Sequence, residues 1–85
     1  MKILIIEDER DLAGLIAFNL EKEGFQTVIA ADGKSGLQMV SMEKPDLVIL
    51  DLMLPEIGGI EICKAIRKNE SIAATPVLMV TAKGE

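Results

Sequence analysis

The sequence predicts an α/β fold in which a parallel β-sheet carries helices on both faces. Short apolar runs alternate along the chain with segments whose apolar residues recur at every third or fourth position, as expected of strands that alternate with helices. The chain has 85 residues, and 49% of them are hydrophobic. Such a chain can form one domain with a modest core, and it is too apolar to be disordered.

The first strand and the first helix are expected within residues 2–23. The run KILII at residues 2–6 is rich in isoleucine and is typical of a strand buried on both faces. Residues 10–23 predict an amphipathic helix whose apolar side turns toward the sheet, and Gly24 is suited to end it. The apolar positions of this helix are Leu12, Leu15, Ile16 and Leu20.

The second strand is expected at residues 26–30, QTVIA. Asp32 can then cap a helix that runs to about Lys44, with Leu37 and Val40 inward. Pro45 would follow the end of that helix, because proline cannot continue it.

Two further strands flank the last predicted helix. They are DLVIL at residues 46–50 and PVLMV at residues 76–80. Between them, residues 59–69 predict a helix that turns Ile62, Cys63 and Ile66 toward the core. Right-handed crossovers would place all the strands in one parallel sheet.

Composition and charge exclude several classes of function. The net charge is −5, basic residues do not cluster and the aromatic content is 2%, so the chain offers no surface suited to nucleic acid or a membrane. It has no histidine and one cysteine, Cys63, which excludes an internal disulfide and a histidine or cysteine metal cluster. The apolar run at the start is too short for a signal peptide, so we expect a cytoplasmic protein.

Residues with oxygen ligands follow three of the expected strands. Glu7 and Asp8 follow the first, Asp51 the third and Thr81 the fourth. Ligands of open α/β sheets bind at the carboxyl ends of the strands, so the three carboxylates would converge if the first and third strands are neighbours. Such oxygen ligands suit Mg²⁺, or else Mn²⁺ or Ca²⁺. Asp51 could then accept a phosphoryl group as a nucleophile, while the Thr81 hydroxyl contacts a phosphate oxygen.

Each of these residues also has a simpler explanation. Glu7 and Asp8 could merely favour the positive N-terminal end of the next helix. Asp51 could be a turn or cap residue, and Thr81 an ordinary strand residue. The combination favours a site, because three separate strands would each place a suitable group at the same rim.

The chain resembles the receiver domain of bacterial two-component response regulators, which has a CheY-like, flavodoxin-like fold. The matching segments cover nearly the whole chain in the family's order: ILIIEDE, AADGKSGL, PDLVILDLMLP, GGIEICKAIR and TPVLMVTA. The segments FNLEKEGF and DLMLP are similar to those of the OmpR/PhoB type of response regulator. Full-length members of that type carry a winged-helix DNA-binding domain. The resemblance implies a signalling domain that controls transcription, rather than an enzyme. Its partner would be a cognate sensor histidine kinase, and it would reach DNA only through an output domain absent from these residues.

The resemblance also implies a role for each site residue. Asp51 would be the phosphoryl acceptor and Thr81 the switch hydroxyl. Asp8 and Asp51 would bind Mg²⁺ directly, together with the backbone carbonyl of Met53, and Glu7 would bind it through a water molecule. The backbone amides of Met53 and Ala82 would contact the phosphoryl oxygens.

The sequence departs from the family in two places. Gly58-Gly59 stands where the family usually has an Asp-Gly pair. The family's fourth helix, fifth strand and fifth helix have no counterpart, and neither does the lysine that pairs with the phosphoryl group, because Lys83 follows Thr81 too closely to replace it. We therefore expect residues 1–85 to be a receiver domain truncated after the strand at 76–80. That strand would form an exposed edge, which favours a homo-oligomer.

Two other classes of function stay open. One is a Mg²⁺-dependent phosphatase or nucleotide-processing enzyme, although the sequence has no glycine-rich phosphate loop, and Met53 stands where such hydrolases usually place a second acid. The other is an inactive or self-associating receiver fragment that acts only as an interaction module. Mg²⁺ binding distinguishes these classes. A functional carboxylate site should bind Mg²⁺ weakly, and Asp8→Asn should abolish that binding.

Overall fold

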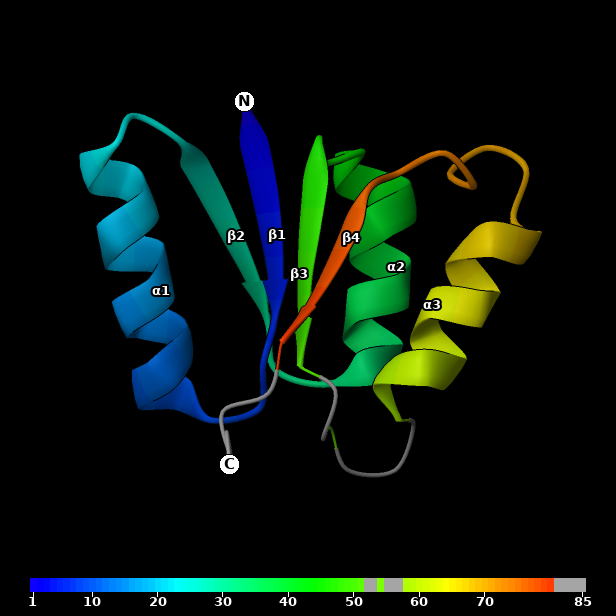
Figure 1. Cartoon of the computed structure of the whole chain (residues 1–85), viewed down its shortest axis with the longest axis horizontal. Helices are drawn as coiled ribbons and strands as arrows, with labels where there is room; N and C mark the ends of the chain where they lie inside the picture. Colours follow the sequence, from blue (N-terminus) through cyan, green and yellow to red (C-terminus); the bar gives the residue numbers. More distant parts are fainter. Residues whose placement is uncertain (52–53, 55–57, 81–85) are drawn as a thin grey trace.

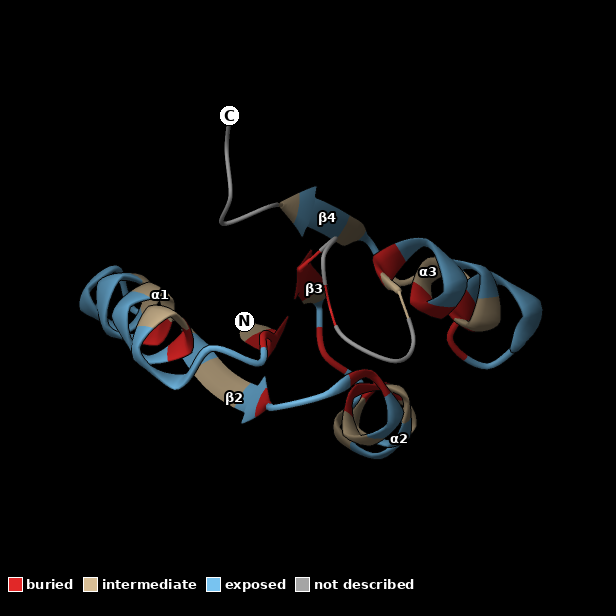
Figure 2. Ribbon diagram, turned by 90° about the horizontal axis from the view of Figure 1, so that it is seen from below, coloured by how far each residue is buried: buried red, intermediate tan, exposed pale blue. Residues whose placement is uncertain are grey.

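A computed structural model of the chain describes residues 1–51, 54 and 58–80. The elements in this part are β1 (Lys2–Ile6), α1 (Arg10–Lys22), β2 (Gln26–Ala30), α2 (Gly33–Glu43), β3 (Leu47–Asp51), α3 (Gly59–Lys68) and β4 (Val77–Val80). The strands are parallel and lie in the order β2-β1-β3-β4. Figures 1 and 2 show α1 on one face of this sheet and α2 and α3 on the other. The predicted fold class is confirmed.

Local chemistry explains where the helices begin and end. The Asp32 carboxylate accepts a 2.7 Å hydrogen bond from the Ser35 N–H, which confirms the predicted cap of α2, and the same bond lowers the pKa of Asp32. Gly24 follows α1 with a φ of 95°, a conformation that glycine adopts without strain. Lys44 ends α2 in the left-handed conformation with a φ of 47°, a role that glycine or asparagine usually has.

The sheet separates two apolar clusters. On the side of α2 and α3, residues of β1 and β3 pack against side chains of both helices. On the side of α1, residues of the same strands pack against α1 alone. Strands β1 and β3 are therefore buried on both faces, as their continuous apolar runs predict. The central members are Leu4, Ile6, Val40, Leu50, Ile62 and Ile66 on the first side, and Ile3, Ile5, Ala13, Ala17 and Ile49 on the second.

Helix α1 packs on the sheet through two buried alanines, with the predicted Ile16 and Leu20 packed beside them. Ala13 and Ala17 are buried, whereas Leu15 is 57% exposed. The prediction that Leu15 turns toward the sheet was therefore wrong. It lies two residues from Ala13, about 200° around the helix, so the two side chains point in nearly opposite directions. The buried alanines let the helix backbone approach the sheet closely.

No helix within residues 1–51, 54 and 58–80 is long and apolar enough to cross a bilayer.

Candidate functional site

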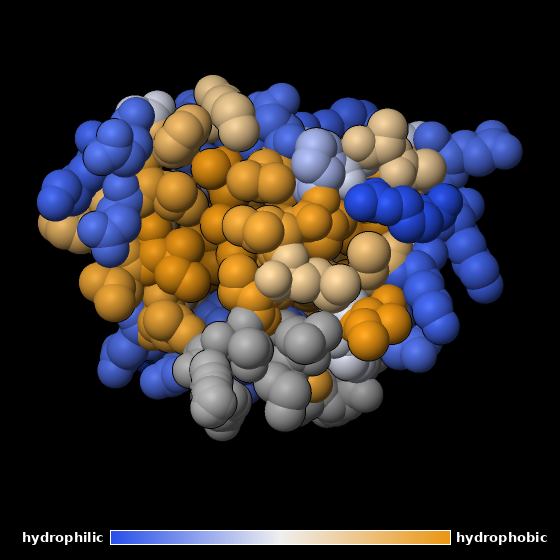
Figure 3. Space-filling model, in the orientation of Figure 1, coloured by the Kyte–Doolittle hydropathy of each residue, from blue (hydrophilic) through white to orange (hydrophobic). Residues whose placement is uncertain are grey.

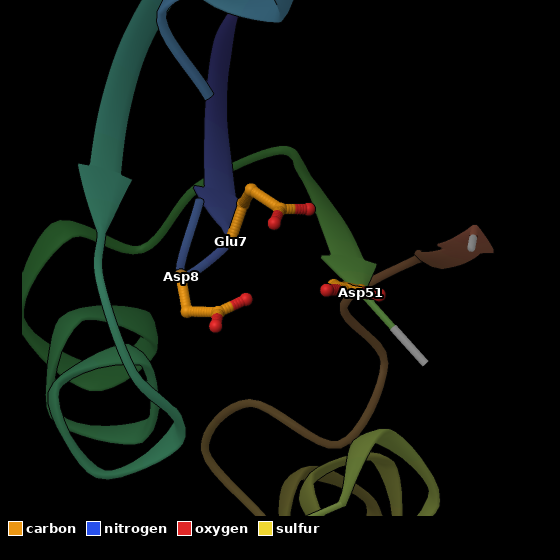
Figure 4. A group of neighbouring side chains, drawn as sticks. All are labelled: Glu7, Asp8 and Asp51. Atoms are coloured by element: carbon orange, nitrogen blue, oxygen red, sulfur yellow. The ribbon is translucent and has the colours of Figure 1, made fainter. Parts of the chain in front are cut away.

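Three carboxylates from two neighbouring strands meet at the carboxyl end of the sheet. Glu7 and Asp8 follow β1, and Asp51 is the last residue of β3. Strand β1 pairs with β3, with Ile6 opposite Leu50, so the two strand ends lie side by side. Figure 4 shows the three side chains turned toward a common space, and one carboxylate oxygen from each lies within 4.8 Å of the others. The expected convergence is present.

Asp51 lies inside the sheet rather than after it. We expected the third strand to end at residue 50, but β3 runs from Leu47 to Asp51, and Asp51 lies opposite Val80 of β4. The residue is only 4% exposed. An ordinary turn residue would lie at the surface, so this position argues against the simpler explanation of Asp51 as a turn or cap residue.

Glu7 is equally buried, at 4% exposure, whereas Asp8 is exposed. The N–H of Glu9, the residue that precedes α1, donates a 3.0 Å hydrogen bond to Glu7 Oε2. This contact fits part of the simpler explanation, in which Glu7 serves the start of the helix. Burial beside two other carboxylates has no such structural benefit, because it places like charges close together.

The environment of Glu7 disfavours its charged form. Burial raises the pKa of Glu7 above its ordinary value of 4.5, and the carboxylates of Asp51 and Asp8 raise it further. The hydrogen bond from Glu9 N–H opposes these effects only in part. A cation bound among the three carboxylates would relieve both the burial cost and the repulsion.

Replacing Glu7 with glutamine should therefore stabilise the metal-free chain at neutral pH. A group whose folded pKa is raised contributes its full stability below the unfolded value of 4.5, and this contribution is lost as the pH rises through the folded pKa. The glutamine side chain keeps an oxygen that can accept the Glu9 N–H. Thermal unfolding at pH 7 in EDTA should show a melting temperature a few degrees above wild type, with the difference vanishing near pH 4. An equal or lower melting temperature at pH 7 would contradict this account.

The donor set suits a hard divalent cation. All three ligands are carboxylate oxygens, the kind that Mg²⁺ and Ca²⁺ prefer. Oxygens on opposite sides of one Mg²⁺ lie about 4.2 Å apart, so a group that spreads over up to 4.8 Å fits a cation held partly by direct contact and partly through water. Glu7, Asp8 and Asp51 could therefore hold Mg²⁺.

A cavity of about 360 Å³ opens beside the acids, between the start of α1 and the end of β2. Arg10 lines it and brings a positive charge to the rim, a feature that the sequence analysis missed because Arg10 fits the first turn of the predicted helix. The other lining residues are Glu7, Asp8, Ala13, Ile29 and Ala31.

The remaining expectations concern residues outside the described part of the chain. They are the roles of the Thr81 hydroxyl and of the backbone groups of Met53 and Ala82, and the expectation that Lys83 does not replace the family's lysine. Their roles stay predictions.

The chain is similar to known proteins. The family model described as response regulator receiver domain matches residues 3–85. The alkaline phosphatase synthesis transcriptional regulatory protein PhoP of Bacillus subtilis is 44% identical over 84 residues, which cover 99% of this chain and 34% of PhoP. The response regulator ArlR of Staphylococcus saprophyticus is 48% identical over 84 residues, which cover 99% of this chain and 37% of ArlR. The chain thus spans about a third of the length of these curated relatives.

Solved structures agree with this comparison. The N-terminal domain of a response regulator receiver protein from Methanoculleus marisnigri superposes with a TM-score of 0.93 at 31% identity, covering 99% of this chain and 68% of that one. The chemotaxis protein CheY4 of Vibrio cholerae gives a TM-score of 0.90 at 28% identity, covering 99% of this chain and 70% of that one. Both neighbours share the fold described above.

Proposed function

The chain belongs to the response regulator receiver domain family, and from this premise we propose that Asp51 accepts a phosphoryl group from a sensor histidine kinase. One observation carries the proposal: Asp51 is buried at the end of β3, within reach of the carboxylates of Glu7 and Asp8. A buried acid among like charges is costly for stability, and such costs are typical of functional sites.

The reaction transfers the phosphoryl group between two nucleophiles. A carboxylate oxygen of Asp51 attacks the phosphorus of a phosphohistidine in line with the leaving nitrogen. The new phosphorus–oxygen bond forms as the phosphorus–nitrogen bond breaks, and the imidazole leaves with the electron pair. A small acyl phosphate can donate in the same way, with its carboxylate as the leaving group. The chain therefore serves as a phosphoacceptor in signalling rather than as an enzyme with a separate substrate.

Glu7, Asp8 and Asp51 supply the charge that Mg²⁺ requires. The family resemblance implies that Asp8 and Asp51 would bind the ion directly and Glu7 through a water molecule, and the three carboxylates lie close enough together to hold one ion. When held by these residues, Mg²⁺ would neutralise charge on the transferring phosphoryl group. The family resemblance implies that the Thr81 hydroxyl, the Met53 carbonyl and the amides of Met53 and Ala82 would complete the site.

The relatives support a proposed role in transcription. PhoP is named a transcriptional regulatory protein, and the chain matches about a third of it. We therefore propose that residues 1–85 act as the phosphoryl-accepting unit of a transcriptional regulator, and that these residues do not themselves contact DNA.

Mass spectrometry of the intact chain tests the proposal. Incubation with acetyl phosphate and Mg²⁺ should add one phosphoryl group to the wild-type chain and none to Asp51→Asn. The matched control is Asp11→Asn, because Asp11 is an exposed acid near the same end of the sheet but outside the carboxylate group. Absence of an adduct on wild-type chain that circular dichroism finds folded would overturn the proposal, and so would an equal adduct on Asp51→Asn.

A further inference from the structure

The cavity beside the carboxylates lies to one side of the candidate site. Its walls come from the end of β1, the start of α1 and the end of β2. Glu7 and Asp8 belong both to these walls and to the carboxylate cluster of Glu7, Asp8 and Asp51, whereas Asp51 belongs to the cluster alone. The strand order β2-β1-β3 explains this arrangement, because it places the two acids that follow β1 between Asp51 and β2. A molecule in the cavity would therefore reach a cation in the cluster from the side opposite Asp51.

Contacts among β1, α1 and β2 hold the walls of the cavity. The Glu7 N–H donates a 3.0 Å hydrogen bond to the Ala30 carbonyl, which fixes the ends of the two strands beside each other. The Thr27 hydroxyl of β2 donates to the Glu21 carboxylate, which holds α1 against the same strand. Figure 1 shows β2 and β4 on opposite edges of the sheet. The shape of the cavity therefore depends on residues 7–31 and not on the β4 side of the sheet.

One side of the cavity is apolar, because Ala13, Ile29 and Ala31 line it. Ile29 lies opposite Ile5 of β1, and Ile5 belongs to the apolar cluster on the α1 face, so the Ile29 side chain lies on that face too. Ile29 is 40% exposed, and the helix residue that shares the cavity with it is the short Ala13. A ligand with an apolar body would cover this surface, which is favourable.

Arg10 is the basic residue of the lining. Its side chain makes no hydrogen bond or ion pair with any residue in the described part of the chain. A guanidinium presents several N–H donors in one plane and binds a carboxylate with two of them. Figure 3 shows hydrophilic residues around the start of α1, in contrast to the apolar surface over β3 and β4. The Arg10 guanidinium is therefore available to an anion.

The charge of the cavity depends on the cation. Without one, the ionised carboxylates of Glu7 and Asp8 outweigh the single positive charge of Arg10, so the cavity repels an anion. The double positive charge of Mg²⁺ in the carboxylate cluster would reverse this balance. Mg²⁺ also keeps several positions filled by water, and an oxygen of an anion can replace such a water molecule. An anion in the cavity would then contact Arg10 and the cation together.

We propose that this cavity binds a small monocarboxylate with an apolar body once a divalent cation occupies the carboxylate cluster. The carboxylate of the ligand lies between the cation and the Arg10 guanidinium, and the apolar body covers Ala13 and Ile29. The volume of about 360 Å³ accommodates on the order of ten non-hydrogen atoms at roughly 30 Å³ each. Benzoate has this size and chemistry. The inference rests on the metal site of the proposed function, but not on phosphoryl transfer to Asp51.

The carboxylate and the cation must strengthen each other's binding. By thermodynamic reciprocity, the factor by which Mg²⁺ raises the affinity for the carboxylate equals the factor by which the carboxylate raises the affinity for Mg²⁺. Opposite charges that meet at the edge of a partly buried site should give a factor of about ten or more. A small carboxylate would thus act as an effector that increases metal occupancy beside Asp51.

Nuclear magnetic resonance titrations with benzoate test the proposal. With saturating Mg²⁺, benzoate should shift the backbone amide signals of Arg10, Ala13, Ile29 and Ala31, with a dissociation constant on the order of 1 mM. In EDTA the affinity should fall at least about tenfold. Benzamide has nearly the same shape without the charge, so in Mg²⁺ it should bind at least about tenfold less tightly than benzoate. Equal affinity in Mg²⁺ and EDTA, equal binding of benzamide, or no shift at these four residues would overturn the proposal.

A titration with Mg²⁺ alone separates this inference from the proposed metal site. Mg²⁺ should shift the amide signals of Glu7, Asp8 and Asp51 before any benzoate is added. If these signals do not change, the metal site and the cavity proposal fail together. If they shift and benzoate still does not bind, the cavity proposal fails alone.

Variants of two lining residues locate the ligand. Arg10→Gln should weaken benzoate binding in Mg²⁺ at least about tenfold, and Arg10→Lys should recover part of the loss, because lysine keeps the charge without the paired donors. Ala31→Leu should fill the cavity and block benzoate, and Ala31 is exposed, so the fold can accept the larger side chain. Lys64→Gln is the matched control, because it removes an exposed basic residue of α3, on the other face of the sheet. Wild-type benzoate affinity in both Arg10→Gln and Ala31→Leu would place the ligand elsewhere and overturn the proposal.

Discussion

Replacing Asp8 with asparagine should abolish Mg²⁺ binding and at the same time stabilise the metal-free chain. Asp8 is the exposed residue among the three clustered carboxylates, so it is the side chain that a hydrated cation meets first. Its charge also repels Asp51 and Glu7, and Asp8 is one of the groups that raise the pKa of Glu7. Loss of the charge therefore removes both a ligand and a source of repulsion.

Thermal unfolding at increasing Mg²⁺ concentrations measures both effects together. Wild-type chain should gain stability with Mg²⁺, because a ligand that binds only the folded state stabilises it by mass action. Asp8→Asn should begin at a higher melting temperature and show at least about 100-fold weaker Mg²⁺ dependence. Asp11→Asn, an exposed acid outside the group, should behave like wild type. If Mg²⁺ raises the melting temperature of all three proteins equally, the cluster of Glu7, Asp8 and Asp51 is not the metal site.

Replacing Gly36 with alanine should destabilise the fold, although alanine is the better helix former. Gly36 lies in α2 where the helix crosses β1, and a Cβ atom built on it would lie 2.5 Å from Ile6 Cδ1, 2.9 Å from Cγ1 and 3.0 Å from Cγ2. Ile6 is fully buried, so its side chain has no free space to enter. Overpacking of this kind costs about 1–3 kcal/mol, and the gain in helix propensity offsets at most about 1 kcal/mol of it.

Gly14 provides the matched control, because it is a helical glycine with nothing within 4 Å of its added Cβ. Chemical denaturation should show that Gly14→Ala stabilises the chain by up to about 1 kcal/mol, whereas Gly36→Ala destabilises it. Adding Ile6→Val, which removes Cδ1, should recover part of the loss in the Gly36→Ala background. Equal effects at the two glycines would show that the close approach between α2 and β1 has no energetic weight.

The strands and helices could be predicted from local patterns because burial and helical period are local signals. The isoleucine-rich run at residues 2–6 buries its side chains only in a strand covered on both faces. Asp32 marks the start of α2 because its side chain caps the helix. The face of α1 that contacts the sheet could not be predicted in the same way. Ile16 and Leu20 pack on the core as predicted, but Leu15 is exposed, and Ala13 and Ala17 are the buried residues of the helix. The left-handed Lys44 likewise carries no signal in its residue type.

The residues of the carboxylate cluster could be predicted from the sequence, but how deeply they are buried could not. Glu7, Asp8 and Asp51 were placed at one rim because parallel strands share an orientation, and the pairing of β1 with β3 confirms this. The extension of β3 to include Asp51 depends on its pairing with Val80, a contact between distant parts of the sequence. The cavity beside Arg10 depends on the packing of α1 against β2, which no local pattern reveals.

Locating the phosphoryl group within the chain tests the central claim most directly. The wild-type chain is incubated with Mg²⁺ and acetyl phosphate and then reduced with borohydride, which converts an aspartyl phosphate to homoserine. Peptide mass spectrometry should find homoserine at position 51 and nowhere else, in proportion to the adduct on the intact chain. An adduct that maps to another residue, or a folded, Mg²⁺-binding chain without homoserine at position 51, would contradict the assignment of Asp51 as the acceptor.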